Sequence, residues 1–344
     1  FSPAYTLSNT RFYYRYGNGM PRSWEDVKGR DILISSHSHH EELLLSMKQQ
    51  YPWLKWRVDR EHKPYQLMQL VQNEQADLIV LDSNTFLLNQ GLFPKVRPAL
   101  QIGKEKPMAW AVTKNHDLSF YHAIAHYFSL IEEDGTLDNL KDIYFEHMSA
   151  MNSGGSNMFY QRIKTRLPRY EALFKKAADD FQLDWHLLAA MSYQESFWNP
   201  KAVSPTGVRG LMMLTRSTAG SLGISDRSDP EQSVMGGAAY FSSIREQLDS
   251  NIAEPDRTWL ALAAYNAGLG HLEDARTLTQ RYGGDPKKWA DVKKHFPFLM
   301  QKTHYSTVKY GYARGEETVN YVQRIRQYYS ILTWRSRMQV FTGR

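Results

Sequence analysis

Apolar and polar positions follow two different patterns along the chain, and the first covers residues 22–135. There, short apolar runs alternate with segments whose apolar positions recur at helical spacing. The runs predict strands at 31–35, 53–58, 76–81 and 106–114, and the segments predict helices at 39–50, 65–74 and 118–135. Because strands alternating with helices of this length are typical of a parallel sheet, we expect an α/β domain over residues 1–150.

The second pattern begins after a short segment without periodicity. Residues 151–158 are mostly small and polar, a composition typical of a flexible connection, and we predict that they form a linker. Beyond them the apolar spacing is helical, and it predicts helices at 159–181, 184–198, 216–222, 231–248, 257–267, 270–283, 286–294 and 316–332. We therefore expect an all-α domain over 159–344 and, for the whole chain, a multidomain α+β protein.

The segment 257–267 is apolar on all sides, which predicts a helix buried at the centre of the second domain. Gly268 follows it and is suited to end the helix in a left-handed conformation. Tyr265 and Asn266 are its only polar side chains near that end, and buried polar groups need partners. They could contact a ligand or simply cap the helix.

One carboxylate lies within the apolar pattern of the predicted helix 184–198. Asp184 is a suitable N-cap, and Glu195 continues a stripe that contains Leu187 and Met191. An acid on such a stripe is expected to be desolvated, which raises its pKa and keeps it protonated near neutral pH. That is the state of a general acid that protonates a leaving oxygen. The alternative is an acid at a frayed helix end that faces solvent, and periodicity alone leaves both open.

Composition and charge narrow the classes of function. The 344 residues are 42% apolar and 23% charged, as in ordinary globular proteins, and 13% aromatic, which suits clefts that stack on sugars or peptides. The absence of cysteine excludes disulfides and thiol catalysis, and no run of about 18 apolar residues predicts a membrane span. The formal charge of +6 is spread along the chain, so we expect an anionic polymer such as the cell wall as partner, and not nucleic acid. Because the chain starts at Phe1 and not at Met, we expect a processed product.

Five short motifs follow one another in the helical half. They are Gln194-Glu195-Ser196-Phe197-Trp198-Asn199-Pro200, Ser204-Pro205-Thr206-Gly207, Gly210-Leu211-Met212, Ala263-Ala264-Tyr265-Asn266-Ala267-Gly268 and Glu317-Thr318-Val319-Asn320-Tyr321-Val322. Together they resemble the catalytic domain of the soluble-lytic-transglycosylase type, a helical lysozyme-like fold that acts on peptidoglycan. The resemblance covers residues 159–335.

This resemblance implies a mechanism with a single catalytic carboxylate and no cofactor. Glu195 would protonate the glycosidic oxygen between N-acetylmuramic acid and N-acetylglucosamine, while the 2-acetamido group of the muramic sugar stabilises the reacting carbon. The resulting carboxylate would deprotonate the C6 hydroxyl of the same sugar and close a 1,6-anhydro ring. Ordinary glycosidases need two carboxylates, whereas the resemblance assigns catalysis to Glu195 alone.

The resemblance also implies a set of residues that line the substrate groove: Ser204, Met213, Tyr265, Asn266, Glu317 and Tyr321. Ser204 would orient the acetamido group or the acid, and Tyr265 would hold Glu195 or the sugar through its hydroxyl. Tyr321 is a second candidate donor near the acid. Glu317 either organises the groove floor or is an acid at a helix N-terminus. Met213 stands where the family usually has a glutamine.

The α/β half resembles periplasmic solute-binding proteins of the amino-acid-binding type, mostly one of their two lobes. By this resemblance Ser36 and Ser38, at a helix start, would hold a ligand carboxylate on backbone N–H groups, and Asp82, at a strand end, would bind a ligand amine. A scaffold without a ligand is the alternative. Five side chains at 37–42, three His and two Glu, could suggest a metal site, but neighbouring positions on a helix start point apart. We expect at most two of them near one ion, and no metal.

The sequence thus predicts a two-domain periplasmic enzyme on the inner face of the outer membrane. Its substrate would be the peptidoglycan glycan strand, and a muropeptide or stem peptide bound by the first domain would regulate it. Two alternatives stay open: a hydrolase like goose-type lysozyme, and a non-catalytic protein that binds the cell wall or a solute.

Overall fold

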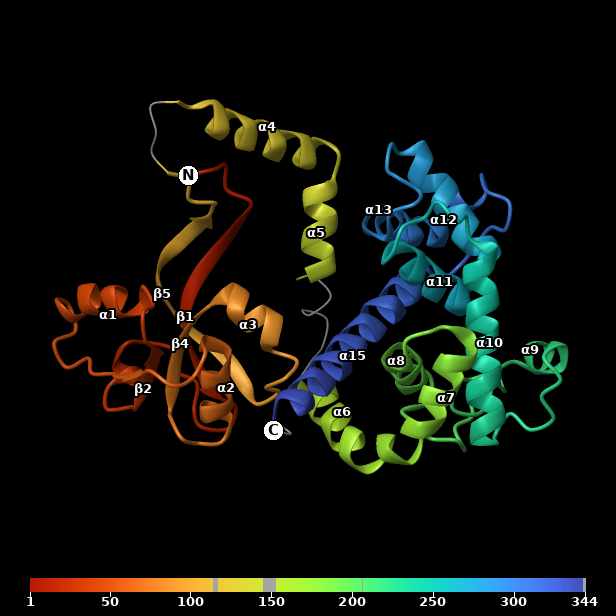
Figure 1. The fold of residues 1–344 in the computed structure, drawn as a ribbon, viewed down its shortest axis with the longest axis horizontal. Helices are drawn as coiled ribbons and strands as arrows, with labels where there is room; N and C mark the ends of the chain where they lie inside the picture. Colours follow the sequence, from red (N-terminus) through yellow and green to blue (C-terminus); the bar gives the residue numbers. More distant parts are fainter. Residues whose placement is uncertain (114–116, 145–152, 206, 343–344) are drawn as a thin grey trace. The chain divides into compact units, whose positions relative to one another are not determined.

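The computed structural model describes residues 1–113, 117–144, 153–205 and 207–342, and the chain divides into two units, Phe1–Ser149 and Ala150–Arg344 (Figure 1). The first contains a sheet with flanking helices, and the second is helical. The expected α+β multidomain class is therefore confirmed. In the described residues, no helix combines the length and the hydropathy required to cross a bilayer.

The first unit is built on a five-stranded sheet of order β3-β2-β4-β1-β5. Its strands are β1 (Thr6–Arg15), β2 (Ile32–Ser35), β3 (Arg57–Asp59), β4 (Leu78–Asp82) and β5 (Val96–Met108). β2 pairs in parallel with both β3 and β4, as predicted. The prediction of a parallel sheet is wrong for β1, which lies antiparallel between β4 and β5.

The hydrophobic pattern misplaced two strands and missed a third. β3 shares only residues 57 and 58 with the strand predicted at 53–58. β5 begins ten residues before the predicted strand at 106–114 and shares only 106–108 with it. Its second half, 103–108, is exposed and contains Lys104, Glu105 and Lys106, so it shows no apolar run. β1 was not predicted, because only half of its residues are buried and its pairing partners lie far away in sequence.

Helices α1 (His40–Lys48), α2 (Pro64–Gln72), α3 (Ser83–Asn89), α4 (Ser119–Glu133) and α5 (Thr136–Tyr144) complete the described part of this unit. The core of the sheet contains Phe12, Ile34, Leu44 and Val80, all fully buried. Because β2 and β4 run in parallel, their carboxyl ends lie at the same edge of the sheet. The start of α1 and the end of β4 meet at this edge.

The second unit consists of helices, as predicted. They are α6 (Ser153–Thr165), α7 (Glu171–Phe181), α8 (Trp185–Ser196), α9 (Arg216–Ser221), α10 (Pro230–Gln247), α11 (Asp256–Ala267), α12 (Leu269–Arg281), α13 (Trp289–His295), α14 (Lys302–Tyr305) and α15 (Gly315–Thr342), with 3₁₀ turns at Leu167–Arg169 and Phe296–Met300. α8 and α11 both pack against α15, the long blue helix of Figure 1.

Three of these helices differ clearly from the sequence prediction, and one of them, α15, extends ten residues beyond the predicted end at 332. The predicted helix 159–181 is interrupted by the turn Leu167–Arg169, because Pro168 lacks the N–H that a helix interior needs. The predicted linker 151–158 is helical from residue 153, whereas 151 and 152 lie outside the described residues. Gly and Ser are weak helix formers, but α6 is anchored one turn later by the buried side chains of Phe159 and Ile163.

Helix α11 occupies the centre of the second unit, as its apolar sequence predicted. All six residues from Trp259 to Ala264 are buried. The expected left-handed end at Gly268 is wrong in detail. Gly268 has φ 93° and ψ 148°, an extended conformation of positive φ, and it is the residue from which α12 starts at once. A glycine is still required, because only glycine adopts this conformation without strain.

Candidate active site

Helix α8 begins and ends at residues that fix the position of Glu195 in its last turn. Asp184 is the N-cap, and its carboxylate accepts a hydrogen bond of 2.8 Å from the backbone N–H of His186. The helix ends because Phe197 and Trp198 both have positive φ, 54° and 55°. Trp198 is buried, and its indole N–H donates to the carbonyl of Ala189 at 2.9 Å. This anchor holds two residues in a region that side chains normally avoid.

The carboxyl group of Glu195 lies in a desolvated environment. Part of the residue reaches the surface, but the carboxyl group is surrounded by protein, and this burial raises its pKa from 4.5 to about 7. The hydroxyl of Tyr321, on α15, donates to Oε1 of Glu195 at 2.5 Å and acts in the opposite direction. The group thus can hold a proton at neutral pH and can also release it.

Two buried tyrosines accompany this acid. Burial, followed by the charge of Glu195, raises the pKa of Tyr321 and of Tyr265 well above the ordinary value, so both hydroxyls stay protonated. The resemblance assigned the Tyr265 hydroxyl to Glu195 or to the sugar. In the structure, the Tyr265 hydroxyl instead donates to the carbonyl oxygen of Met212 at 2.9 Å. Tyr321 is therefore the tyrosine that donates to the acid.

The loop of residues 204–214 is fixed against α8 by small hydroxyl side chains. Ser192 and Ser196, one turn apart on α8, each donate to the carbonyl of Leu211 at 3.0 Å. Ser233 of α10 accepts from the N–H of Met212 at 3.1 Å. Sequence reasoning missed these three serines. Their signal is a hydroxyl within an otherwise apolar buried helix, where it needs a partner.

Ser204 and Met213 lie on this same loop. Isolated β-bridges join Val203 to Arg209 and Arg209 to Leu214. Ser204 directly follows the first bridged residue, and Met213 directly precedes the last one. The Ser204 hydroxyl accepts from the N–H of Val208 at 3.2 Å, and Met213 has a positive φ of 49°. Their contact with substrate stays a prediction.

Asn266 and Glu317 lie at the junction of α11 and α15. Asn266 is exposed, and its side-chain oxygen accepts from the hydroxyl of Thr318 at 2.9 Å. Glu317 is exposed in the first turn of α15, 3.4 Å from Arg314. The latter position fits an acid at a helix N-terminus, and a role in the groove floor stays a prediction.

The residues predicted to bind a ligand in the first unit lie at the carboxyl edge of β2 and β4. The backbone N–H of Ser36 donates to the carbonyl of Asp59 at 2.7 Å, because the pairing of β2 with β3 continues past Ser35. This N–H is engaged within the sheet, and a contact of Ser36 with a ligand stays a prediction. The Ser38 hydroxyl donates to Ser35 at 2.6 Å. Asp82 has Thr10, His39 and His40 around its carboxylate.

Comparison with known proteins identifies the family. Residues 172–288 match the family described as Transglycosylase SLT domain. The chain is 43% identical to membrane-bound lytic murein transglycosylase F of Saccharophagus degradans, covering 97% of this chain and 67% of that protein. It is 47% identical to the protein of that name from Ectopseudomonas mendocina, covering 99% of this chain and 70% of that protein. The chain belongs to the membrane-bound lytic murein transglycosylase F family.

Membership of the transglycosylase F family confirms the resemblance drawn from the five motifs. The matched SLT segment contains Glu195, Ser204 and Tyr265, whereas Glu317 and Tyr321 lie beyond it. Tyr321 is joined to the matched segment by its hydrogen bond to Glu195.

Solved structures similar to this chain include solute-binding proteins. An ancestral arginine-binding protein bound to arginine is 20% identical, with a TM-score of 0.37, and covers 42% of this chain and 64% of its own. A histidine kinase sensor domain with similarity to periplasmic binding proteins is 13% identical, with a TM-score of 0.35. In this chain, the fold of the first unit is defined by its own sheet order, β3-β2-β4-β1-β5.

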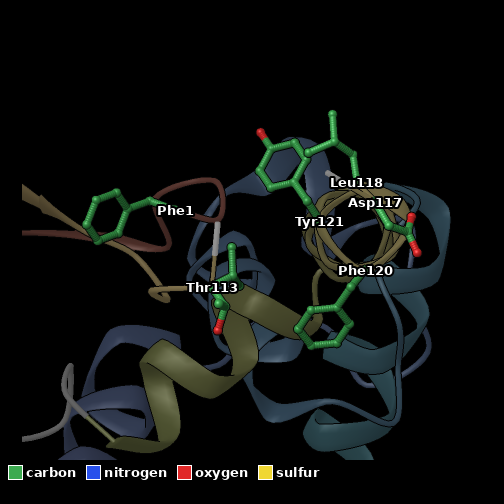
Figure 2. A pocket seen from close by; sticks show the side chains of 7 residues that line it. Phe1, Thr113, Asp117, Leu118, Phe120 and Tyr121 are labelled. Carbon is green, nitrogen blue, oxygen red and sulfur yellow. The ribbon is translucent and has the colours of Figure 1, made fainter. Parts of the chain in front are cut away.

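A cavity of about 480 Å³ lies at the start of α4. Figure 2 shows the ring of Phe1 on one side of it and Phe120 and Tyr121 of α4 on the other. Its lining residues are Phe1, Val112, Thr113, Asp117, Leu118, Phe120 and Tyr121. It is therefore a different place from the strand ends that carry Asp82.

Proposed function

We propose that this chain is a peptidoglycan lytic transglycosylase that cleaves the β-1,4 bond between N-acetylmuramic acid and N-acetylglucosamine and leaves a 1,6-anhydro-muramic end. The observation that carries the proposal is the enclosed carboxyl group of Glu195, whose pKa of about 7 lies near the pH at which it would work. Membership of the transglycosylase F family supports the same substrate.

The proposed reaction uses Glu195 twice. First its proton passes to the glycosidic oxygen, the C1–O bond breaks, and N-acetylglucosamine leaves with that proton. The sugar's own acetamido oxygen stabilises C1. Then the Glu195 carboxylate accepts the proton of the C6 hydroxyl while O6 bonds to C1, which restores the acid without consuming water. The Tyr321 hydroxyl stabilises the carboxylate that forms between the two steps, because it already donates to Oε1.

The test is digestion of purified murein by the intact chain and by Glu195→Gln. We expect the substitution to lower turnover by about 10²–10⁴-fold, the usual contribution of a positioned general acid. The matched control is Glu231→Gln, a carboxylate of the same unit that is exposed and paired with Lys176, which should keep full activity. Mass spectrometry of the products identifies the reaction.

Each alternative predicts a different product. A lytic transglycosylase releases muropeptides lighter by one water than those of a hydrolase like goose-type lysozyme. Hydrated products from the wild-type chain would contradict the proposal. A non-catalytic wall-binding protein would give no product. Its binding to murein would be the same in the wild type and in Glu195→Gln.

We further propose that the chain acts in the periplasm, at the inner face of the outer membrane, and that the first unit binds a muropeptide or stem peptide that alters access to the groove. Support for the location comes from the membrane-bound relatives, and support for the regulatory ligand comes from the resemblance of the first half of the sequence to solute-binding proteins. The test is turnover of the intact chain against increasing muropeptide concentration. Equal rates at all concentrations would contradict regulation, and recovery of the protein away from outer-membrane fractions would contradict the location.

A further inference from the structure

Three side chains that can bind a metal ion converge at the carboxyl edge of β2 and β4. His39 immediately precedes α1, His40 is its first residue, and Asp82 ends β4. Nε2 of His39 lies 3.4 Å from Oδ1 of Asp82, and Nε2 of His40 lies 3.3 Å from Oδ2. One donor atom from each of the three residues lies within 4.8 Å of the others. Both imidazoles, from neighbouring residues at the start of α1, contact the carboxylate of Asp82 at the end of β4.

We propose that His39, His40 and Asp82 bind a divalent transition-metal cation of the zinc type, with the remaining position open to water or to a ligand. Imidazole nitrogen and carboxylate oxygen are zinc ligands at about 2.0–2.2 Å, and three protein ligands with one open position make a known zinc arrangement. Around a tetrahedral ion at that distance, donor atoms are roughly 3.3 Å apart. The separations of 3.4 and 3.3 Å from the imidazoles to Asp82 are close to that value, and all three donor atoms lie within 4.8 Å of one another.

The state of His40 is the second observation. Its side chain is buried, with 3% exposed, and neither ring nitrogen has a hydrogen-bond partner among the described residues, although Nε2 lies close to Asp82. A buried imidazole without a partner is unfavourable by an amount comparable to a lost hydrogen bond. A cation between Nε2 of His40 and Oδ2 of Asp82 removes that deficit at Nε2.

A neighbouring hydroxyl holds the carboxylate of Asp82 in place. The Thr10 hydroxyl donates to Oδ1 of Asp82 at 2.8 Å and orients the carboxylate, as residues behind metal ligands commonly do.

The donor set fits an ion of the zinc type, because it combines two imidazole nitrogens with one carboxylate, all within 4.8 Å of one another. A ligand amine on Asp82, which the sequence suggested, would need the carboxylate but neither imidazole. The site is independent of the proposed catalytic reaction, because it involves no residue of the second unit.

The experiment is a zinc titration of the intact chain after treatment with a chelator, by calorimetry and by equilibrium dialysis. We expect one equivalent of Zn²⁺ bound at this site, and a higher melting temperature with zinc than without. Asp82→Asn and His39→Gln should each weaken binding by at least about tenfold, and Thr10→Val by a similar or smaller factor. Glu195→Gln should bind zinc as the wild type does, which separates this site from the catalytic proposal.

The matched control is His62→Gln. His62 forms another His–Asp contact in the same unit, with Nδ1 3.0 Å from Oδ2 of Asp59, but among the described residues no third metal-binding side chain joins that pair. It should keep the full zinc affinity. Because the His40 side chain is buried, His40→Gln is informative only if its circular dichroism is unchanged, and the partly exposed His39 carries the test otherwise. Absence of zinc binding, or equal affinity in Asp82→Asn, His39→Gln and His62→Gln, would overturn the proposal.

Discussion

The pKa of Glu195 results from two opposed contributions at one carboxyl group. Burial raises it to about 7, while the hydrogen bond from Tyr321 limits the increase. Tyr321→Phe removes only that donor, so we predict that the pKa of Glu195 rises further. The alkaline limb of the pH–rate profile should then move to higher pH, because the acid keeps its proton longer, and turnover at neutral pH should fall by about tenfold as the carboxylate intermediate loses its donor.

The control for this prediction lies on the same helix. Tyr329, two turns further along α15, donates in the same way to a different carboxylate, that of Asp184, at 2.8 Å. Tyr329→Phe should therefore leave the pH–rate profile in place. An unchanged alkaline limb in Tyr321→Phe would show that this hydroxyl does not set the pKa of the catalytic group.

The raised pKa of Glu195 also predicts a loss of stability at high pH. The folded protein holds this proton up to about pH 7, whereas the unfolded chain releases it near 4.5. Between these values the folded state binds more protons, so stability falls as the pH rises through this window, in total by about 3 kcal/mol. Glutamine has no proton to lose. Glu195→Gln should therefore be more stable than the wild type above pH 8 by up to about 3 kcal/mol, and equally stable below pH 4.

Urea unfolding at pH 4, 6 and 8 measures this difference. The exposed pair of Glu231 and Lys176 offers the matched substitution Glu231→Gln, which should change stability by less than about 1 kcal/mol at every pH. A Glu195→Gln protein that is no more stable than the wild type at pH 8 would contradict the burial of this carboxyl group.

The loop of residues 204–214 depends on one glycine for its approach to the neighbouring chain. Gly210 and Gly207 both have positive φ, 88° and 82°, but a Cβ on Gly210 would lie 1.8 Å from the carbonyl oxygen of Arg227, whereas one on Gly207 would meet nothing within 4 Å. Gly207→Ala should therefore lose only about 1 kcal/mol, from the conformation itself. Gly210→Ala should lose about 3 kcal/mol or more and should lower activity, because the loop moves from α8.

Urea unfolding of the two variants, together with turnover on murein, tests this comparison. Since the two positions have similar positive φ angles, the difference between them reports the close approach. Equal losses of stability would mean that backbone conformation alone, and not contact with Arg227, requires glycine at this place.

At the scale of elements, the sequence was most informative where a local pattern decides the structure. The all-apolar α11 and the Asp184 cap of α8 were predictable because burial and capping act within one helix. β1 and the first half of β5 were not, because their stability comes from antiparallel pairing across 80 or more residues and needs no apolar run. The left-handed pair after Glu195 gave no signal either, since Phe197 and Trp198 do not favour that conformation.

The candidate site could be predicted only in part for a similar reason. Glu195 is identified by its place on an apolar stripe, but its partner Tyr321 lies 126 residues away, and only the family resemblance brought the two together. In the first unit, the same limit concealed the convergence of His39 and His40 with Asp82. Neighbouring side chains do point apart on a helix, but His39 precedes α1, and a strand end supplies the third group.

At the scale of the whole molecule, the net charge predicts how the chain meets its substrate. The formal charge is +6 and is spread over the sequence, so attraction to an anionic wall polymer would act over the whole molecule and be screened by salt. Binding of the inactive Glu195→Gln protein to murein sacculi should weaken by roughly tenfold between 0.05 and 0.5 M salt, because the Debye length falls about threefold. Co-sedimentation measures this binding without digestion of the polymer. Sacculi whose carboxyl groups have been amidated provide the control and should bind weakly at both salt concentrations. If binding is the same at both salt concentrations, contacts between the sugar and the groove determine the affinity, and the basic surface contributes nothing to it.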